Sequence, residues 1–177
     1  MLSKPTIGEY PAYMQKYLDQ LPEGDILDQL DNQIDQLQSL LETLTEEQAE
    51  TPYAPGKWSI KELVNHLIDT ERILAYRALC IARGESQPLP GFDEDSYARD
   101  SFANQRPLKE LLDEHELVRL STIALYRSFN PLVFQNTGNA NGNPASVRAL
   151  AFVIAAHEQH HYNILISRYL VKAEVTL

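Results

Sequence analysis

The sequence predicts an all-α protein, a four-helix bundle with one long crossover connection, formed as a single domain by residues 1–177. Two observations carry this prediction. Four long segments repeat apolar residues every three or four positions, and each begins at a recognisable helix-start residue. No segment shows a convincing strand pattern. A chain of this length can bury the core that such a bundle needs.

The first long helix is expected to begin after Asp25, a residue type that favours the N-cap position. Its apolar stripe consists of Ile26, Leu30, Ile34, Leu37, Leu41 and Leu44. Residues 1–22 contain three prolines and are expected to be irregular, apart from a short helix around Tyr13 and Met14. Thr45 and Gln48 have the spacing of a capping box, which predicts a short helical turn after the first helix.

The second helix has the clearest start signal in the chain. Ser59 is followed three residues later by Glu62, which is the capping-box pattern, and Gly84 supplies the stop signal. The residues expected on its polar strip are Lys61, Asn65, Asp69, Arg72 and Tyr76. His66 lies on the flank of the opposite, buried side, so it can face a neighbouring helix.

The second half of the chain alternates connections and helices. Residues 84–106 form a long connection, which is either a functional lid or a plain crossover between parallel helices. Pro107 suits the first turn of a third helix, whose apolar side includes His115. Residues 130–145 are rich in Asn and Gly and predict turns, after which Ser146 caps the last helix.

The last helix, expected over residues 147–170, contains three of the five histidines. A narrow stripe on this helix consists of Leu150, Ile154, His157, His161 and Leu165. His157 and His161 are four residues apart and therefore share a face. His160 lies about 100° away from His161, at the edge of the stripe. Two imidazoles thus occupy positions where apolar side chains are expected.

These histidines predict a metal site. Burying two adjacent imidazoles without a partner is unfavourable, and a divalent metal removes the difficulty because neutral imidazole is a good ligand. His66 is the expected third ligand, beside His157 and His161. The zinc motif His-Glu-x-x-His does not fit, because the matching histidines are only three residues apart. Three histidines leave an open coordination position, as catalytic sites do. His115 and His160 are candidates for supporting roles, and His115 also for a fourth ligand.

Composition excludes several classes of function. The formal net charge of −10 and the pI near 4.9 oppose binding to nucleic acid. No apolar run is long enough for a membrane span, and residues 1–20 show no secretory signal. Cys80 is the only cysteine, so an internal disulfide is impossible. We therefore expect a cytoplasmic protein that interacts with neither membranes nor nucleic acid.

Two stretches of the sequence form a recognisable pattern. Residues 55–62 read Pro-Gly-Lys-Trp-Ser-Ile-Lys-Glu and are followed by His66, and residues 156–161 read Ala-His-Glu-Gln-His-His. Residues 89–95 and 146–150 add to the match. The chain resembles the DinB-like (YfiT-like) superfamily of metal-dependent enzymes over nearly its whole length. The resemblance implies an up-down-down-up bundle, often dimeric, with metal ligands at positions that correspond to His66, His157 and His161.

Two functions are expected from these observations. The first is an enzyme, either a hydrolase or a transferase of a low-molecular-weight thiol, which uses nickel or zinc, with manganese or iron as alternatives. Candidate substrate contacts are Arg77, Asp93, Asp95, Tyr97 and Arg99. The second is a non-catalytic, metal-stabilised dimer that acts in a stress response or as a binding module. Apolar residues off the metal-facing side of the last helix could form the two-fold contact, namely Phe152, Val153, Ile166 and Tyr169.

Overall fold

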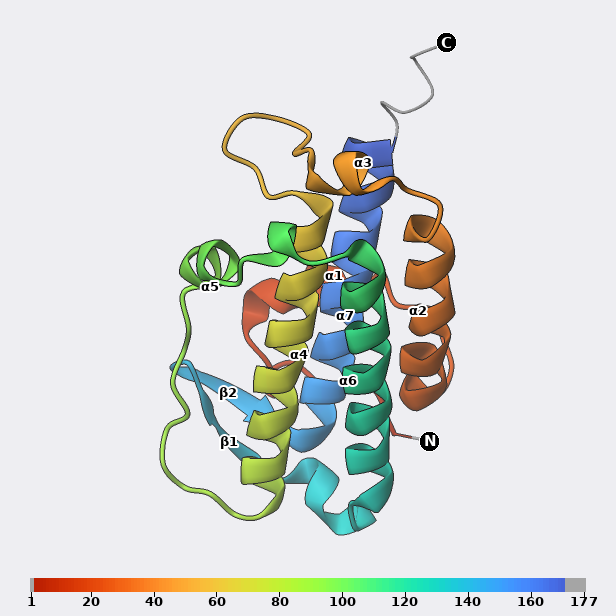
Figure 1. Cartoon of the computed structure of the whole chain (residues 1–177). Coiled ribbons are helices and arrows are strands. Elements are labelled where there is room, and N and C mark those ends of the chain that lie inside the picture. Colours follow the sequence, from red (N-terminus) through yellow and green to blue (C-terminus); the bar gives the residue numbers. More distant parts are fainter. Residues whose placement is uncertain (1, 171–177) are drawn as a thin grey trace.

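The computed structural model describes residues 2–170 and contains a bundle of four long helices (Figure 1). They are α2 (Ile26–Leu41), α4 (Ile60–Ala82), α6 (Leu108–Ser128) and α7 (Val147–Ile164). Helices α2 and α7 run in one direction, and α4 and α6 run in the other (Figure 1). This is the up-down-down-up order, in which the parallel pair α4 and α6 requires a long crossover connection. The predicted fold is confirmed.

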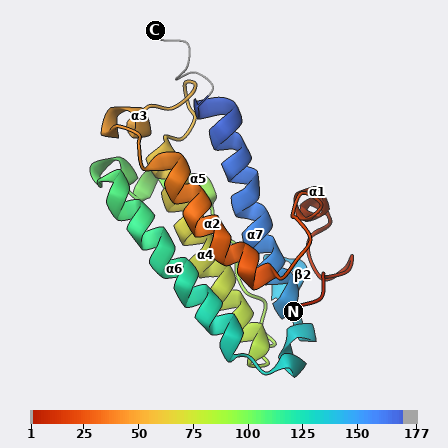
Figure 2. The ribbon, with the colours of Figure 1, turned by 90° about the vertical axis from the view of Figure 1, so that its right-hand side faces the viewer.

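Both α4 and α2 pack against α6 and α7, so the four long helices enclose one interior (Figure 2).

Shorter helices complete the bundle. The N-terminal segment contains η1 (Ala12–Met14) and α1 (Gln15–Leu18), and α1 lies against α7. Helix α3 (Glu46–Glu50) packs on α4. The short helices expected before and after the first long helix are therefore present.

Capping side chains set the starts of the helices as predicted. Asp25, Ser59 and Ser146 accept backbone hydrogen bonds at the first turns of α2, α4 and α7. Ser59 and Glu62 complete the capping box of α4, and Thr45 caps α3 in the same way. The last helix continues from α7 into the π-helical segment η4 (Leu165–Leu170). No helix within residues 2–170 combines the length and apolar character needed to cross a membrane.

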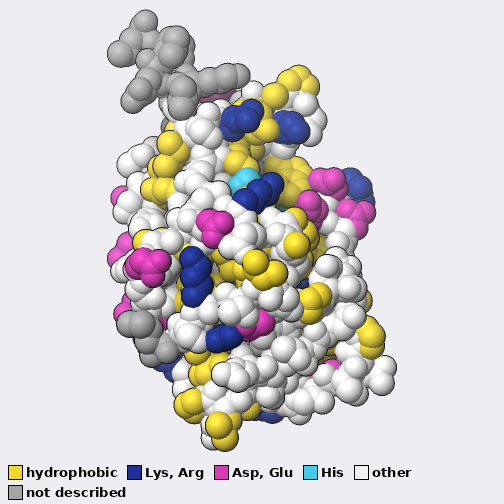
Figure 3. Space-filling view, turned by 180° about the vertical axis from the view of Figure 1, so that it is seen from behind, with side chains coloured by type: hydrophobic (Ala, Val, Ile, Leu, Met, Phe, Trp, Pro, Cys, Tyr) yellow, Lys and Arg dark blue, Asp and Glu magenta, His cyan; other side chains and the backbone are white. Residues whose placement is uncertain are grey.

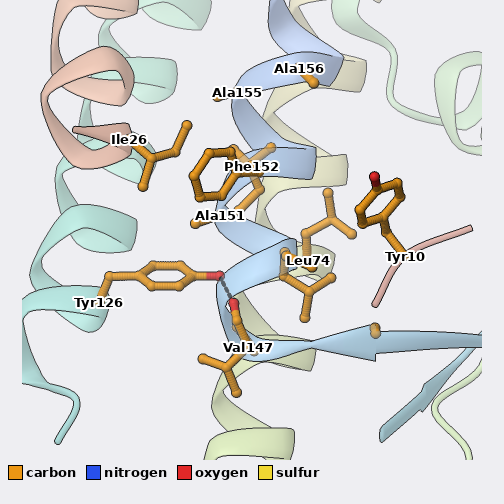
Figure 4. Packing of buried hydrophobic residues seen from close by; sticks show 14 of the residues in the cluster. Tyr10, Ile26, Leu74, Tyr126, Val147, Ala151, Phe152, Ala155 and Ala156 are labelled. Atoms are coloured by element: carbon orange, nitrogen blue, oxygen red, sulfur yellow. Dashed lines mark hydrogen bonds between the residues drawn. The ribbon is translucent and has the colours of Figure 1, made fainter. Parts of the chain in front are cut away.

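The lower part of the bundle is filled by apolar side chains from all four helices (Figure 4). Phe152 of α7 points toward Ile26 of α2, and Tyr10 of the N-terminal segment closes the other side (Figure 4). The hydroxyl of Tyr126 on α6 donates to the carbonyl oxygen of Val147 over 3.1 Å. This bond satisfies a polar group inside the core and ties α6 to the first turn of α7.

The apolar residues expected to serve a dimer contact are mostly used within one chain. Phe152 is buried in the core, and Val153 packs partly buried against it. Tyr169 donates its hydroxyl to the carbonyl oxygen of Trp58 over 2.6 Å and packs against the core beside α4. Of the four, Ile166 is exposed. The surplus apolar surface inferred for the last helix therefore mainly covers its own bundle.

A small hairpin corrects the prediction that the chain has no strand. Strands β1 (Thr137–Ala140) and β2 (Asn143–Ser146) pair antiparallel. Asn141 and Gly142 connect them with φ values of 53° and 75°, the left-handed conformation that a two-residue hairpin turn requires. The Asn-Gly pair is a strong hairpin signal, but the Gly, Asn and Pro of the flanking strands have low β-propensity and hide it. The expected turn is present, and its arms form the strands.

The long connection between α4 and α6 is fastened to this hairpin. Leu89 exchanges two backbone hydrogen bonds of 2.9 Å with Asn139 and Asn141. Further along, the connection forms α5 (Glu94–Asp100) and η2 (Ala103–Gln105), and Pro107 stands at the N-cap of α6 rather than in its first turn. These contacts fix the first half of the connection and favour the crossover interpretation over the lid.

Part of the polar strip predicted on α4 is buried, which corrects that prediction. Lys61 is 2% exposed and Asn65 is also buried. Lys61 forms ion pairs of 2.6 and 2.7 Å with Glu46 and Glu50, which lie on α3. Helix periodicity could not reveal this arrangement, because it depends on α3 folding back over the start of α4.

Candidate metal centre

Three histidines from two helices meet at one point in the upper half of the bundle. His66 comes from α4, and His157 and His161 come from successive turns of α7. The Nε2 atom of His157 lies 3.0 Å from Nε2 of His66 and 3.2 Å from Nε2 of His161. One ring nitrogen of each residue lies within 4.8 Å of the other two. The stripe on the last helix and the flank position of His66 therefore predicted the cluster correctly.

Burial keeps these imidazoles neutral. Desolvation lowers the pKa of His66 to about 4. Desolvation also lowers the pKa of His161 to about 3, and the positive charges that His66 and His160 carry when protonated add to this effect. The pKa of His157 lies well below its usual value for the same reason. The negative charge of Asp95 works in the opposite direction on the pKa of His66. At neutral pH all three rings thus retain a free lone pair for a ligand bond.

The donor set fits a divalent metal ion. The Nε2 atom of His157 faces the Nε2 atoms of His66 and His161. A proton on this atom can be donated to at most one of them, so one nitrogen lone pair remains without a hydrogen-bond donor. Nitrogen ligands about 2.0–2.1 Å from a shared ion lie roughly 3 Å apart or slightly more, which agrees with the observed spacings. The Nδ1 atom of His161 is buried and has no partner within residues 2–170, whereas Thr70 Oγ1 lies 3.5 Å from Nδ1 of His66. A cation would resolve the crowding of the three lone pairs.

A cavity of about 230 Å³ leads to the cluster at His161. Its walls are mainly aromatic and apolar, and include Tyr53, Trp58, Leu63, Ile164 and Tyr169. The Trp58 ring packs against the His66 imidazole, with 4.8 Å between the ring centres. Lys57 and Asp95 are the charged residues of the lining. The histidine cluster can therefore be reached from outside by a small molecule.

A second buried cluster lies beside the first and explains where His115 points. His115 Nε2 lies 3.0 Å from Oε2 of Glu158, so it does not serve the three-histidine cluster as a fourth ligand. Arg119 of α6 bonds to Glu71 of α4 over 2.9 Å and also contacts Glu158 of α7. Its guanidinium donates as well to the carbonyl oxygen of Leu30 on α2 over 2.8 Å. One arginine thus joins all four helices.

Sequence comparison places this site in a known family. The model of the DinB superfamily matches residues 29–165, which include all three histidines. The chain belongs to the DinB superfamily. A relative from Oceanobacillus iheyensis, provisionally named a metal-dependent hydrolase, is 25% identical over 136 residues, covering 76% of this chain and 78% of the relative. A relative from Bacillus licheniformis with the same provisional name is 28% identical over 128 residues, covering 71% and 72%.

A solved structure shows that the fold of this DinB superfamily member is known. YfiT from Bacillus subtilis, described as a probable metal-dependent hydrolase with an unusual four-helix bundle topology, superposes with a TM-score of 0.74. The match covers 97% of this chain and 94% of YfiT at 16% sequence identity. At this level of identity the comparison establishes the shared fold.

His160 lies outside the three-histidine cluster of this DinB superfamily member. Its ring packs on Tyr17 of α1 with 4.5 Å between the ring centres, and at 5.2 Å from the ring of His161. Partial burial and the nearby charge of Lys16 lower its pKa. His160 therefore supports the packing of α1 on α7. On the face of the molecule seen from behind, a small area of histidine surface lies beside Lys or Arg side chains (Figure 3).

Of the predicted substrate contacts, the structure brings Asp95 to the site. It lines the cavity that leads to His161. Asp93 caps α5, Arg99 pairs with the adjacent Asp100 over 2.9 Å, and Tyr97 packs on Phe92 with 5.1 Å between the ring centres. Arg77 lines a different cavity. These four residues do not line the cavity that leads to the cluster.

Sequence reasoning missed the buried network of Glu71, Arg119 and Glu158, although a signal was present. Glu71 follows Leu67 by one helical turn on the apolar stripe of α4, and Arg119 follows His115 by one turn on the stripe of α6. Charged residues are almost never fully buried unless they are paired. Two opposite charges on the apolar stripes of different helices therefore indicate a buried ion pair.

Proposed function

We propose that this protein is a metal-dependent hydrolase whose divalent ion is held by His66, His157 and His161. The observation that carries the proposal is the convergence of three neutral imidazole nitrogens, 3.0 and 3.2 Å apart, at the end of an accessible cavity. The provisional names of the relatives support hydrolysis as the reaction class. Nickel or zinc is the proposed ion, with manganese or iron as alternatives, because all of them accept imidazole.

The chemistry needs a polarised nucleophile and a place for the substrate. A divalent ion bound there would act as a Lewis acid and lower the pKa of a bound water or thiol. Three ligands without a fourth from the described residues leave the side toward the cavity open. Asp95, the carboxylate of the cavity lining, would accept a proton or orient the attacking group. The aromatic walls around Trp58 favour a substrate with an apolar group next to the scissile bond.

Turnover of small chromogenic esters tests this function. Protein purified without a metal-affinity tag is loaded with nickel or zinc and assayed against aryl esters, with and without a small thiol. We expect hydrolysis that disappears on chelation and in His66→Ala, and that persists in the matched control His160→Ala. Asp95→Asn should lower the rate by roughly 10²-fold or more if Asp95 transfers a proton.

Other outcomes of the same assay would replace the proposal. Release of the chromophore only when a thiol is present would assign thiol transfer instead of hydrolysis. Turnover that survives chelation or His66→Ala would contradict a metal mechanism. If chelation unfolds the protein and no substrate is turned over, the metal is structural, as expected of a non-catalytic metal-stabilised protein.

A further inference from the structure

Arg77 is a buried cation without a carboxylate partner. It lies in α4 and is 7% exposed. The other buried cations of the described residues are paired: Lys61 with Glu46 at 2.6 Å, and Arg119 with Glu71 at 2.9 Å. Within residues 2–170, no carboxylate oxygen lies within 4.0 Å of the Arg77 guanidinium. Buried charges are normally paired, so this position lacks one negative charge.

Within residues 2–170, most N–H donors of Arg77 have no hydrogen-bond acceptor. Its Nη2 atom donates to the carbonyl oxygen of Pro90 over 2.6 Å, which anchors the crossover connection. A guanidinium has five N–H donors in a planar fork and stays charged in proteins. Burial lowers the pKa of Arg77, and the nearby Tyr13 partly offsets this effect. Water has therefore been withdrawn from the cation without a compensating anion.

A cavity of about 80 Å³ borders Arg77. It lies between the N-terminal segment, the hairpin, α4 and α7, and its lining includes Tyr10, Tyr13, Asn143, Leu74, Leu150 and Val153. Glu9 also borders it, but this carboxylate is occupied by Arg148 at 2.5 Å and by Ser146 at 2.7 Å. The volume exceeds the roughly 30 Å³ of one water molecule, so a group of several heavy atoms fits.

We propose that this cavity binds a small organic anion, a carboxylate or phosphate group carrying a short apolar substituent. Arg77 would form charge-assisted hydrogen bonds with the anion, the Tyr13 hydroxyl would add one more at the mouth, and Leu150 and Val153 would contact the apolar part. Arg77 follows His66 by eleven residues (77 − 66), which is about 16 Å along the helix axis. The anion site is therefore separate from the three-histidine cluster and does not depend on its metal.

Calorimetric titration of the metal-free protein tests the site. Butyrate and inorganic phosphate are titrated at constant ionic strength, with chloride as the reference anion. We expect saturable binding of one of the two anions with a stoichiometry of one, and a rise in the thermal midpoint because ligands stabilise the state that binds them. A response to butyrate assigns a carboxylate ligand, and a response to phosphate assigns a phosphate ligand.

Matched variants distinguish this cavity from other positive surfaces. Arg77→Gln should abolish the saturable response, and Tyr13→Phe should weaken the affinity about fivefold through loss of one hydrogen bond. Arg99→Gln, at an exposed arginine, should bind like the unaltered protein. If Arg77→Gln does not fold, Val153→Phe, which fills the cavity, takes its place. Absence of saturable binding, or unchanged affinity in these cavity variants, would overturn the proposal.

Discussion

Arg119 shows how a single residue can hold the bundle together. Its guanidinium is fully buried and bonds to Glu71, Glu158 and the carbonyl oxygen of Leu30. The two carboxylates hold its pKa above the usual range, and Arg119 in turn holds the pKa of Glu158 near 2, against the effect of burial. Glu158 therefore remains charged inside the protein, and both glutamates bond to the same cation.

Removing that cation should be strongly destabilising. Arg119→Met would leave two buried carboxylates without their partner, so we expect a loss of about 3–5 kcal/mol in the free energy of unfolding. Arg99→Met is the matched control, because Arg99 is exposed and its loss should leave the stability almost unchanged. The triple variant Glu71→Gln, Arg119→Met, Glu158→Gln should recover part of the loss. Urea denaturation gives the free energy of unfolding of the three variants. Equal stability of Arg119→Met and Arg99→Met would show that Arg119 does not hold the bundle together.

At the scale of elements, local signals in the sequence determine where the helices start. The capping box of Ser59 and Glu62 begins α4, the helix that carries His66. The Ser59 hydroxyl accepts from the N–H of Glu62 over 3.1 Å and also donates to Asn104 Oδ1 over 2.6 Å. It thus links the start of α4 to the end of the crossover connection.

Loss of this cap should be measurable. We expect Ser59→Ala to lower the free energy of unfolding by about 1–2 kcal/mol, since it removes the N-cap and leaves Asn104 without its donor. Ser128→Ala, at an exposed serine near the end of α6, is the control and should have little effect. Thermal or urea melts of the two variants provide the comparison. Equal melting midpoints of Ser59→Ala and Ser128→Ala would show that the cap at Ser59 does not stabilise the protein.

The carboxylate of Glu9 links the N-terminal segment to Ser146 of the hairpin and to Arg148 of α7. Arg148 lowers the pKa of Glu9 far below its usual value of 4.5, and hydrogen bonds from Thr6 and Ser146 add to this effect. Because the folded-state pKa is depressed, the stabilisation is fully present above about pH 4.5 and is lost as the pH falls below it.

Glu9→Gln should therefore be less stable than the unaltered protein at pH 7, with a difference that shrinks as the pH falls from 5 toward 2. Unfolding free energies measured across this range test the prediction, with Glu23→Gln as a control at an exposed glutamate. A difference that stays constant with pH would show that Glu9 does not contribute through its charge.

Much of this molecule could be predicted from its sequence, and the failures share a cause. The four long helices and the three clustered histidines follow from caps and from the 3.6-residue period, both of which are local. Contacts between segments separated in the chain determine the burial of Lys61, the Arg119 network and the attachment of Leu89 to the hairpin. Periodicity reports which face of a helix is apolar, but it does not report which polar residue another segment will cover.

Association is a prediction for the whole molecule. A homodimer is expected from the family resemblance, while Phe152 and Tyr169 are used within one chain. Helices α4 and α6 carry exposed apolar side chains that are available for such a contact, namely Tyr76, Leu117 and Leu120. Sedimentation velocity at micromolar concentration should show a species of twice the 20.1 kDa chain mass, and Leu117→Lys should shift it toward the monomer. A single species at the chain mass would remove this expectation.

Metal stoichiometry in single variants tests whether His66, His157 and His161 together bind one metal ion. The tag-free protein is loaded with nickel or zinc, freed of unbound ion, and examined by elemental analysis and calorimetric titration. We predict about one ion per chain for the unaltered protein and for His160→Ala, and almost none for His66→Ala, His157→Ala or His161→Ala. An empty site in His160→Ala together with a filled one in His161→Ala would contradict the account.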